Sequence, residues 1–411
     1  MKKKMTAALA ALLTLASASG CSSDSGESGG MTVGKVEMAN LAPIEVTEDN
    51  VRNSVRLFDA VSAGKANAMF SPLSLNMALG MLAEGAEGET RAALDGYLGG
   101  DGYGAFAESY MKHAEESLNE PSSLGSKYDN VFEIANSFWA DEEIPFKESY
   151  KSVLQQRFGA EVRNIDFSEK SKALKAINGW VNEKTHKMIP SIISDYDEEL
   201  LKAVLVNTVY FESAWRDEWA INENNMQTFT LLDGSTKELP LMRRGVSSYF
   251  ENDKATAFSC GYRNGLEFIG ILPKETGDFT IESLDIPSLL ESESYDYDVY
   301  ARMPRLKFDS EFDLTKALAA AGLGEIFDPD SADLSGMSEF PLYVSAVLQK
   351  TSLELDENGT KAAAVTAVLM GAGGMPEERE EKYVYLDRPF AFMIYDYVQG
   401  QIVFLGKVTE P

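Results

Sequence analysis

The sequence predicts one large α+β domain in which helices dominate the first half of the chain and strands the second. Apolar residues repeat at helical spacing in several early segments, whereas long β-branched and aromatic runs fill the later ones. No repeat period appears, and no Pro-rich or Ser-rich linker divides residues 45–411. With 411 residues, 44% of them hydrophobic, the chain can bury one large core. Helices and strands that share such a core define the α+β class.

The first half is expected to contain four helices and one strand. Residues 47–64 begin with the N-cap types of TEDN and end at a glycine, and residues 71–84 begin with serine and proline. The second of these helices is apolar on nearly all sides, so we expect it to be buried. The remaining elements are a strand over 131–140 and helices over 146–160 and 169–187.

The second half is expected to be mostly strands. Residues 203–211, AVLVNTVYF, form a β-branched and aromatic run that is typical of a central strand buried on both faces. One helix is expected over 313–327, and the chain ends in a hairpin over 388–408 that turns at Gln399 and Gly400. Further strands are expected within three segments, 238–252, 254–273 and 297–310.

The chain is strongly acidic, with a formal net charge of -28 from 65 acidic and 37 basic residues. Because the phosphates of a nucleic acid would be repelled, this charge argues against nucleic acid as a partner. High solubility is the simplest consequence of the charge.

Residues 1–20 have the organisation of a signal peptide: basic MKKKM, then an apolar run too short to span a bilayer, then small residues. We therefore expect the protein to be exported. Ala18 to Cys21 resembles a bacterial lipobox, in which the cysteine is lipidated. The mature protein is expected to be a cell-surface lipoprotein or a secreted protein, with a lipid on Cys21 as its only membrane contact. Residues 21–42, rich in Ser and Gly, predict a flexible tether before a folded domain over 43–411.

The residues needed for most enzyme chemistry are missing. Only two histidines are present, and both His113 and His186 lie on charged helix faces or ends, where we expect exposed imidazoles. No Cys and His cluster has metal-ligand spacing, so neither a metal site nor a cofactor is expected. Cys260 is interpreted as an unpaired, buried thiol. An exported hydrolase therefore finds no support, and the protein is not expected to be an enzyme.

One segment, DENGTKAAAVTAVLMGAGGMP over residues 356–376, fits neither a core strand nor a loop. Asn358-Gly359 is expected to form a tight turn. If the residues after it form a strand, Thr360 and every second residue are small or apolar, while Lys361 lies on the other face. Alanine is a poor strand former, yet the valines that follow argue against a disordered linker. Such a segment can tolerate exposure and can also be buried.

The segment resembles the hinge of the reactive-centre loop in the serpin family, where an acid, a glycine and a threonine precede an alanine run. The resemblance extends over about 365 residues, because further family motifs occur in the family order. These motifs are FSPLSL at 70–75, MLAEGAEGET at 81–90, INGWVNEKTHKMIP at 177–190, VLVNTVYFESAW at 204–215, MPRLKF at 303–308, DRPFAFMIYD at 387–396 and GQIVFLGKV at 400–408.

The resemblance implies the serpin fold, a single domain of three β-sheets and about nine helices, with an exposed reactive-centre loop at about 357–380. It also implies a monomeric inhibitor that acts as a suicide substrate. A target serine protease, or a cysteine protease, attacks the loop and forms a covalent acyl complex. The cleaved loop then inserts as a strand into the sheet that the family calls sheet A.

The resemblance also assigns roles to individual residues. Counting fourteen residues from Gly359 places the reactive bond between Gly373 and Gly374, with Ala372 or Met370 as alternatives if the register shifts. These small, uncharged residues favour elastase-like or subtilisin-like targets. The implied hinge comprises Glu357, Gly359, Thr360, Ala362, Ala363 and Ala364, and the implied shutter beneath sheet A comprises Ser71, Ser74 and Asn207.

Two positions depart from the family pattern. Lys361 replaces an acid on the outward face, where the change is expected to be tolerated. Gln349 replaces a histidine, so the breach region at the top of sheet A is expected to open through different contacts. A non-inhibitory serpin that acts as a binding module is the alternative function. Such members tend to carry bulky or charged hinge residues, which Thr360 to Ala364 are not.

Overall fold

The structure is a computed structural model that describes residues 31–33, 49–119, 130–197, 201, 203–360 and 379–411. Several sequence predictions fall outside these residues. They concern the signal peptide, Cys21, most of the tether, the alanine run of the hinge and the reactive bond at residues 370–374.

The described residues form three sheets of three or more strands, and the longest strands lie in the first of them, which we call sheet A. Its central strand β6 covers residues 203–214 and has no exposed residue, as the sequence predicts for this run. The order of the strands is β14 (Leu306–Asp313), β15 (Leu348–Leu355), β16 (Gly359–Thr360), β6 (Ala203–Ala214), β3 (Val131–Asp141) and β4 (Glu161–Ile165).

Sheet B lies at the centre of the main core. The predicted C-terminal hairpin supplies two of its strands, and the chain reverses at Gly400, which has φ 64°. The strands in order are β10 (Ser248–Glu251), β11 (Ala255–Gly261), β12 (Glu267–Pro273), β18 (Phe390–Asp396), β19 (Gln401–Val408) and β2 (Asn67–Phe70).

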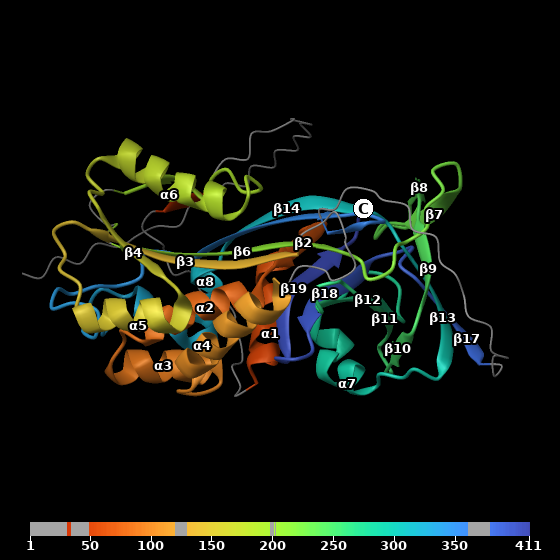
Figure 1. Cartoon of the computed structure of the whole chain (residues 1–411), viewed down its shortest axis with the longest axis horizontal. Helices are drawn as coiled ribbons and strands as arrows, with labels where there is room; N and C mark the ends of the chain where they lie inside the picture. The colour runs from red at the N-terminus through yellow and green to blue at the C-terminus, as the bar shows by residue number, and fades with distance from the viewer. Residues whose placement is uncertain (1–30, 34–48, 120–129, 198–200, 202, 361–378) are drawn as a thin grey trace, which may run out of the picture.

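Sheet C lies at one end of the molecule (Figure 1) and joins strands from distant parts of the chain. Its order is β17 (Glu380–Tyr385), β13 (Tyr297–Met303) and β9 (Met242–Val246). Beside it, β7 (Met226–Thr230) and β8 (Thr236–Pro240) form a separate two-stranded pair.

Helices cover both faces of sheet A. Helix α2 lies under the sheet together with α4 and α5, while α6 lies across the opposite face (Figure 1). Ser71 caps α2, and all but one of its residues are buried, as predicted. Eight α-helices occur in the described residues, where the resemblance implies about nine: α1 (Asn50–Ser62), α2 (Pro72–Ala83), α3 (Gly88–Leu98), α4 (Tyr103–His113), α5 (Glu148–Phe158), α6 (Lys170–Lys184), α7 (Ile286–Glu291) and α8 (Thr315–Leu318).

The prediction of one helix over 313–327 is correct only in part. Strand β14 runs on to Asp313, and α8 covers Thr315–Leu318 before a π-helical turn (Ala319–Leu323) and a 3-10 turn (Gly324–Phe327) complete the segment. The interruption lies at Gly322, whose φ of 89° belongs to the left-handed region that a right-handed helix cannot contain.

The tether prediction is wrong for three of its residues. Met31–Val33 form strand β1, which pairs in parallel with β5 (Ile193–Tyr196). The Met31 N–H donates to the Ile192 carbonyl over 2.9 Å, and the Met31 side chain packs against the small core between α6 and sheet A. These residues bind an open strand edge that no local sequence pattern reveals.

The two histidines differ from one another. His186 is 43% exposed and stacks on Tyr210, as expected for a surface imidazole. His113 contradicts the prediction, because its side chain is only 10% exposed and its Nε2 lies 3.1 Å from Oδ2 of the buried Asp396. Asp396 is the last residue of β18 and His113 the last residue of α4, so the pair depends on tertiary structure. Cys260 is free and buried, as predicted, and burial raises the pKa of its thiol.

Candidate functional site at the opening of sheet A

The first two residues of the predicted loop strand already lie in sheet A. Gly359 pairs with Ala214 of β6, while Thr360 pairs with Ser213 on one side and with Leu355 of β15 on the other. Strand β16 therefore occupies the top of the gap between β15 and β6, and the next described residue after it is Arg379.

Only glycine fits at position 359. Its φ is 153°, and a Cβ atom at this position would lie 2.3 Å from the Ser213 carbonyl oxygen and 2.7 Å from the Ala214 Cα. Both contacts are with backbone, which cannot move aside without breaking β6 pairing. Gly359 thus lets the chain enter the sheet directly against its neighbour.

Thr360 is held from below by a buried aromatic pair. The residue is 4% exposed, and its Oγ1 lies 2.7 Å from the Tyr262 hydroxyl. Tyr262 stacks on Trp215 with ring centroids 4.2 Å apart, and burial raises the pKa of Tyr262 well above its ordinary value. The side chain of Thr360 therefore points into the core, on the face that the sequence alternation assigns to it.

The turn before β16 is fixed by the segment after β6. The Trp215 N–H donates to the Asn358 carbonyl over 2.9 Å, and its indole N–H donates to the Asp356 carbonyl over 2.8 Å. The Trp219 N–H donates to the Glu357 carbonyl over 3.1 Å. Four consecutive residues, 356–359, are thus positioned by one neighbouring segment and by the sheet.

An ion-pair cluster holds the predicted hinge acid. Arg305 donates to Glu357 through Nε and Nη2, each over 2.8 Å, and its Nη1 lies 2.7 Å from Glu223. The hydrogen bonds from Arg305 lower the pKa of Glu357. Arg305 lies in the predicted MPRLKF motif, but nothing in the sequence indicates that it binds the hinge.

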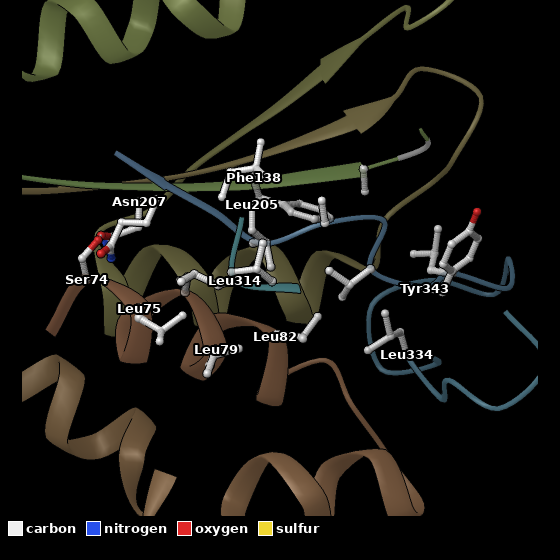
Figure 2. Close-up of a pocket in the computed structure, with 18 of the residues that line it drawn as sticks. Ser74, Leu75, Leu79, Leu82, Phe138, Leu205, Asn207, Leu314, Leu334 and Tyr343 are labelled. Atoms are coloured by element: carbon white, nitrogen blue, oxygen red, sulfur yellow. The ribbon is translucent and has the colours of Figure 1, made fainter. Parts of the chain in front are cut away.

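Below β16, sheet A carries a gap. Strand β6 pairs with β16 only at Ser213 and Ala214, and among the described residues the β15 side of β6 has no strand pairing from Ala203 to Val209. A cavity of ≈ 50 Å³ lies under this part of the sheet, between it and α2 (Figure 2). Its walls include Leu75, Leu79 and Leu82 of α2, Leu205 and Asn207 of β6, and Leu348 and Gln349 of β15.

The three predicted shutter residues are connected by hydrogen bonds beside this cavity. Ser71 Oγ accepts from the Ser74 N–H over 3.1 Å and donates to the Val403 carbonyl of sheet B over 2.7 Å. The Ser74 hydroxyl donates to Asn207, and Asn207 donates to Asn136 of β3. Ser74 and Asn207 face each other at the edge of the cavity (Figure 2).

The expected effect of Gln349 on the breach is wrong, because Gln349 lies next to Ser71, six residues along β15 from Leu355 at the top. Its Oε1 accepts from the Ser71 N–H over 2.8 Å, and its Nε2 donates to the Ser71 carbonyl over 2.9 Å. An amide can make both bonds at once, whereas a neutral imidazole has one donor and one acceptor on a rigid ring. Gln349 thus joins sheet A to the start of α2.

Comparison with known proteins identifies the family. Residues 48–411 match the family model described as Serpin (serine protease inhibitor). The chain belongs to the serpin family. It is 29% identical over 388 residues to leukocyte elastase inhibitor A of Mus musculus, covering 89% of this chain and 100% of that protein. It is 30% identical over 387 residues to leukocyte elastase inhibitor of Equus caballus, again with 89% and 100% coverage.

The solved structures agree with the family. The native-state crystal structure of a thermophilic serpin, tengpin, matches this serpin with a TM-score of 0.77 and 29% identity, covering 93% of this chain and 97% of tengpin. The expected fold, a serpin domain of mixed helices and sheets with a core shared by both, is therefore confirmed.

Sequence reasoning predicted hinge and shutter residues for this serpin but missed the residues that contact them. Tyr262, Trp215, Arg305 and Asn136 are all distant in sequence from the residues they contact. Among the described residues, no three His, Cys, Asp or Glu side chains are grouped so that they could hold a metal ion. Nor does any helix in the described ranges have the length and apolar character to cross a bilayer.

Proposed function

We propose that this serpin inhibits serine-type endopeptidases as a suicide substrate and traps an elastase-like or subtilisin-like protease by inserting its cleaved loop into sheet A. The observation that carries this proposal is the position of Gly359 and Thr360. They already pair at the top of a gap in which, among the described residues, no strand pairs with the β15 side of β6 from Ala203 to Val209. A loop cleaved near Gly373 would be free to extend this short strand downward.

The chemistry of the trap needs nothing from this chain except a substrate bond. The protease serine oxygen attacks the carbonyl of Gly373, an ester forms, and the amine of Gly374 leaves with the proton from the serine hydroxyl. Water would ordinarily hydrolyse the ester. Insertion of the loop before that step would carry the tethered protease along sheet A by roughly 45 Å, at ~3.3 Å for each of fourteen residues.

Insertion is favourable because it satisfies backbone groups along the gap. Each hydrogen bond contributes ~1 kcal/mol net, and burial of Val368 and Met370 adds to this, so ~10 kcal/mol becomes available to distort the protease active site. The leucines that line the cavity between α2 and sheet A give the side chains of Val368 and Met370 an apolar surface to contact. The outcome is a kinetic competition between insertion and hydrolysis of the ester.

The target class follows from the sequence around the reactive bond. Gly373 and Gly374, or Ala372 or Met370 in a shifted register, offer a small and uncharged residue to the specificity pocket. The names of the leukocyte elastase inhibitors support an elastase-like target. A cysteine protease, which also forms an acyl intermediate, is a second target class for the same trap.

The same proposal covers where the protein acts. The sequence at the N-terminus supports export, followed either by lipidation of Cys21 at the cell surface or by secretion of a monomer. Mass spectrometry of the mature N-terminus distinguishes these two fates, because a lipidated cysteine would carry the mass of its acyl chains.

The experiment that tests inhibition is a denaturing gel of the protein mixed with elastase-like, subtilisin-like, trypsin-like and papain-like proteases. We expect an SDS-resistant complex with the first two classes, and sequencing of the released C-terminal peptide locates the cleaved bond. If every protease cleaves the loop without a complex, or leaves it intact, the trap is excluded. The non-inhibitory binding module is then the better description.

A further inference from the structure

The outer face of sheet C exposes a compact set of tyrosines. Tyr300 of β13 is 42% exposed and Tyr383 of β17 is 56% exposed, although neighbouring residues on the opposite face are buried. The strand register places Tyr300 between Tyr383 on one side and Gly245 of β9 on the other. The next row on the same face places Arg302 between Tyr385 and Arg243.

These side chains are held in place before any partner arrives. Tyr300 and Tyr383 stack with ring centroids 5.3 Å apart, and Tyr383 meets the Tyr385 ring edge to face at 5.9 Å. The guanidinium of Arg302 lies 4.2 Å over the Tyr385 ring, and its Nη1 donates to Gln227 over 2.6 Å. Because these side chains are already ordered, binding of a partner would cost little further side-chain entropy, and this favours their use as a contact surface.

A notch adjoins the tyrosines. Gly245 has no side chain, and a Cβ placed there would find its nearest atom, the Val299 carbonyl oxygen, 3.9 Å away. One side of Tyr300 is therefore open between the ring and Arg243. Tyrosine and arginine are the residues most enriched at the energetic centres of protein interfaces, and a partner side chain could enter this notch.

The chain connectivity indicates which partner would meet this face. Strand β17 begins at Glu380, seven residues after Gly373, so the proposed reactive bond lies within ~25 Å of β17 along a fully extended chain. A protease domain of about 230 residues has a radius of gyration of about 17 Å. A protease bound at residue 373 would therefore cover surface at this distance. Tyr383 and Tyr385 lie on β17, the strand that follows the loop in the sequence, and Tyr300 lies on the neighbouring strand β13.

We propose that the tyrosine face of sheet C, comprising Tyr300, Tyr383, Tyr385, Arg302 and Gly245, is a docking surface for the target protease outside its substrate cleft. This inference rests on the proposed inhibitory function and deepens it. The face stabilises the first complex between serpin and protease, so it governs the rate of association. It has no part in the later insertion, because sheets A and C have no strand in common among the residues that the structure describes.

The test compares association rates of the full chain with the protease that forms the SDS-resistant complex. In a Tyr300→Ser, Tyr383→Ser double variant we expect the second-order rate constant to fall at least ~10-fold, the effect of losing interface centre residues. The number of inhibitor molecules used per protease trapped should not change. Gly245→Lys, which fills the notch from an extended strand, should slow association while leaving both tyrosines in place.

Phe340→Ser is the matched control. Phe340 is 51% exposed, but its segment is bonded to the start of α5, which lies at the other end of the molecule from sheet C (Figure 1). This variant should associate at the unaltered rate. The rate at which the protease hydrolyses a free peptide with the sequence of residues 361–378 measures recognition of the loop sequence without the rest of the serpin.

Each outcome is decisive. If the unaltered protein traps the protease and the double variant traps it at the same rate, the docking surface is excluded while the inhibitory function stands. If the unaltered protein forms no complex with any protease, both proposals fail. If sedimentation shows that the unaltered protein is a dimer and the double variant a monomer, the face binds a second copy of this chain, and protease docking is overturned.

Discussion

Sheets A and B have six strands each, yet their pairing differs. Every neighbouring pair in sheet B is joined over four to seven residue pairs. In sheet A, β3 and β6 form ten pairs and β14 and β15 form eight, but within the described part of the chain the two halves are joined only through Gly359 and Thr360. Sheet B is therefore paired continuously from edge to edge, whereas the described strands of sheet A form two halves joined at the top.

The difference shows where this fold can still gain stability. The inner strands of sheet B are each paired on both sides, so no further strand can enter between them. Sheet A keeps an incomplete edge above a cavity, held by short contacts at the hinge and at Ser71, Ser74 and Asn207. Substitutions placed in one sheet or the other therefore test whether the two sheets differ in this way.

The largest effect is expected from Thr360→Arg. The side chain at this position points into the core against Tyr262, and a buried unpaired charge is strongly unfavourable. The variant should be cleaved as a substrate and form almost no SDS-resistant complex on a gel. Thr360→Val, which removes only the hydroxyl, should still trap the protease, and so should Val398→Arg at an exposed turn. Normal complex yield from Thr360→Arg would contradict the role of the hinge.

Phe392→Ala in sheet B should destabilise the protein by ~3–5 kcal/mol, as for other buried aromatic truncations. Phe392 is fully buried and stacks on Phe268 with centroids 5.7 Å apart. Because sheet B is complete before and after insertion, urea unfolding should give the same loss for uncleaved and loop-cleaved protein. A loss confined to one of the two forms would show that sheet B also changes. Tyr397→Ala on the surface is the control.

Gln349→Ala should destabilise the uncleaved protein by ~1–3 kcal/mol, because the buried Ser71 N–H loses its acceptor. The loss of a bond between sheet A and α2 should also speed insertion, measured as the rate of fluorescence change after loop cleavage. The stability and the insertion rate of Gln349→His should lie between those of the unaltered protein and those of Gln349→Ala. Unchanged stability in both variants would mean that water replaces the amide.

The smallest effect concerns pH. Since the folded protein lowers the pKa of Glu357 from 4.5, its ion pair with Arg305 contributes stability fully above pH 4.5 and loses it as the pH falls through the lowered value. Burial raises the pKa of the neighbouring Asp356, which acts in the opposite sense. Thermal midpoints of the protein and of Glu357→Gln should therefore differ above pH 4.5 and converge below it. A constant difference would exclude this linkage.

Elements with local signals could be predicted from the sequence. Helix α2 has its serine cap, proline and apolar surface in one stretch, and the terminal hairpin has its turn between two apolar strands. The hinge and shutter residues were predicted through a family resemblance rather than through such signals. The break in the helix predicted over 313–327 could not be foreseen, because periodicity alone does not show that Gly322 takes a left-handed conformation.

Contacts between distant residues could not be predicted. Arg305 and Glu357, Tyr262 and Thr360, and His113 and Asp396 come into contact only once elements distant in sequence are paired or packed together. The pairing of Met31–Val33 with β5 is of the same kind, because it depends on an open strand edge and not on the composition of the tether.

Hydrogen exchange of the backbone amides before and after loop cleavage tests the central claim most directly. Sheet A is predicted to be incomplete, so peptides covering Ala203–Val209 of β6 and Leu348–Leu355 of β15 should exchange at least ~10-fold more slowly once the loop has inserted between them. Peptides from β18 and β19 of sheet B should be unchanged. Equal exchange of the sheet A peptides in both states would contradict insertion and with it the proposed mechanism.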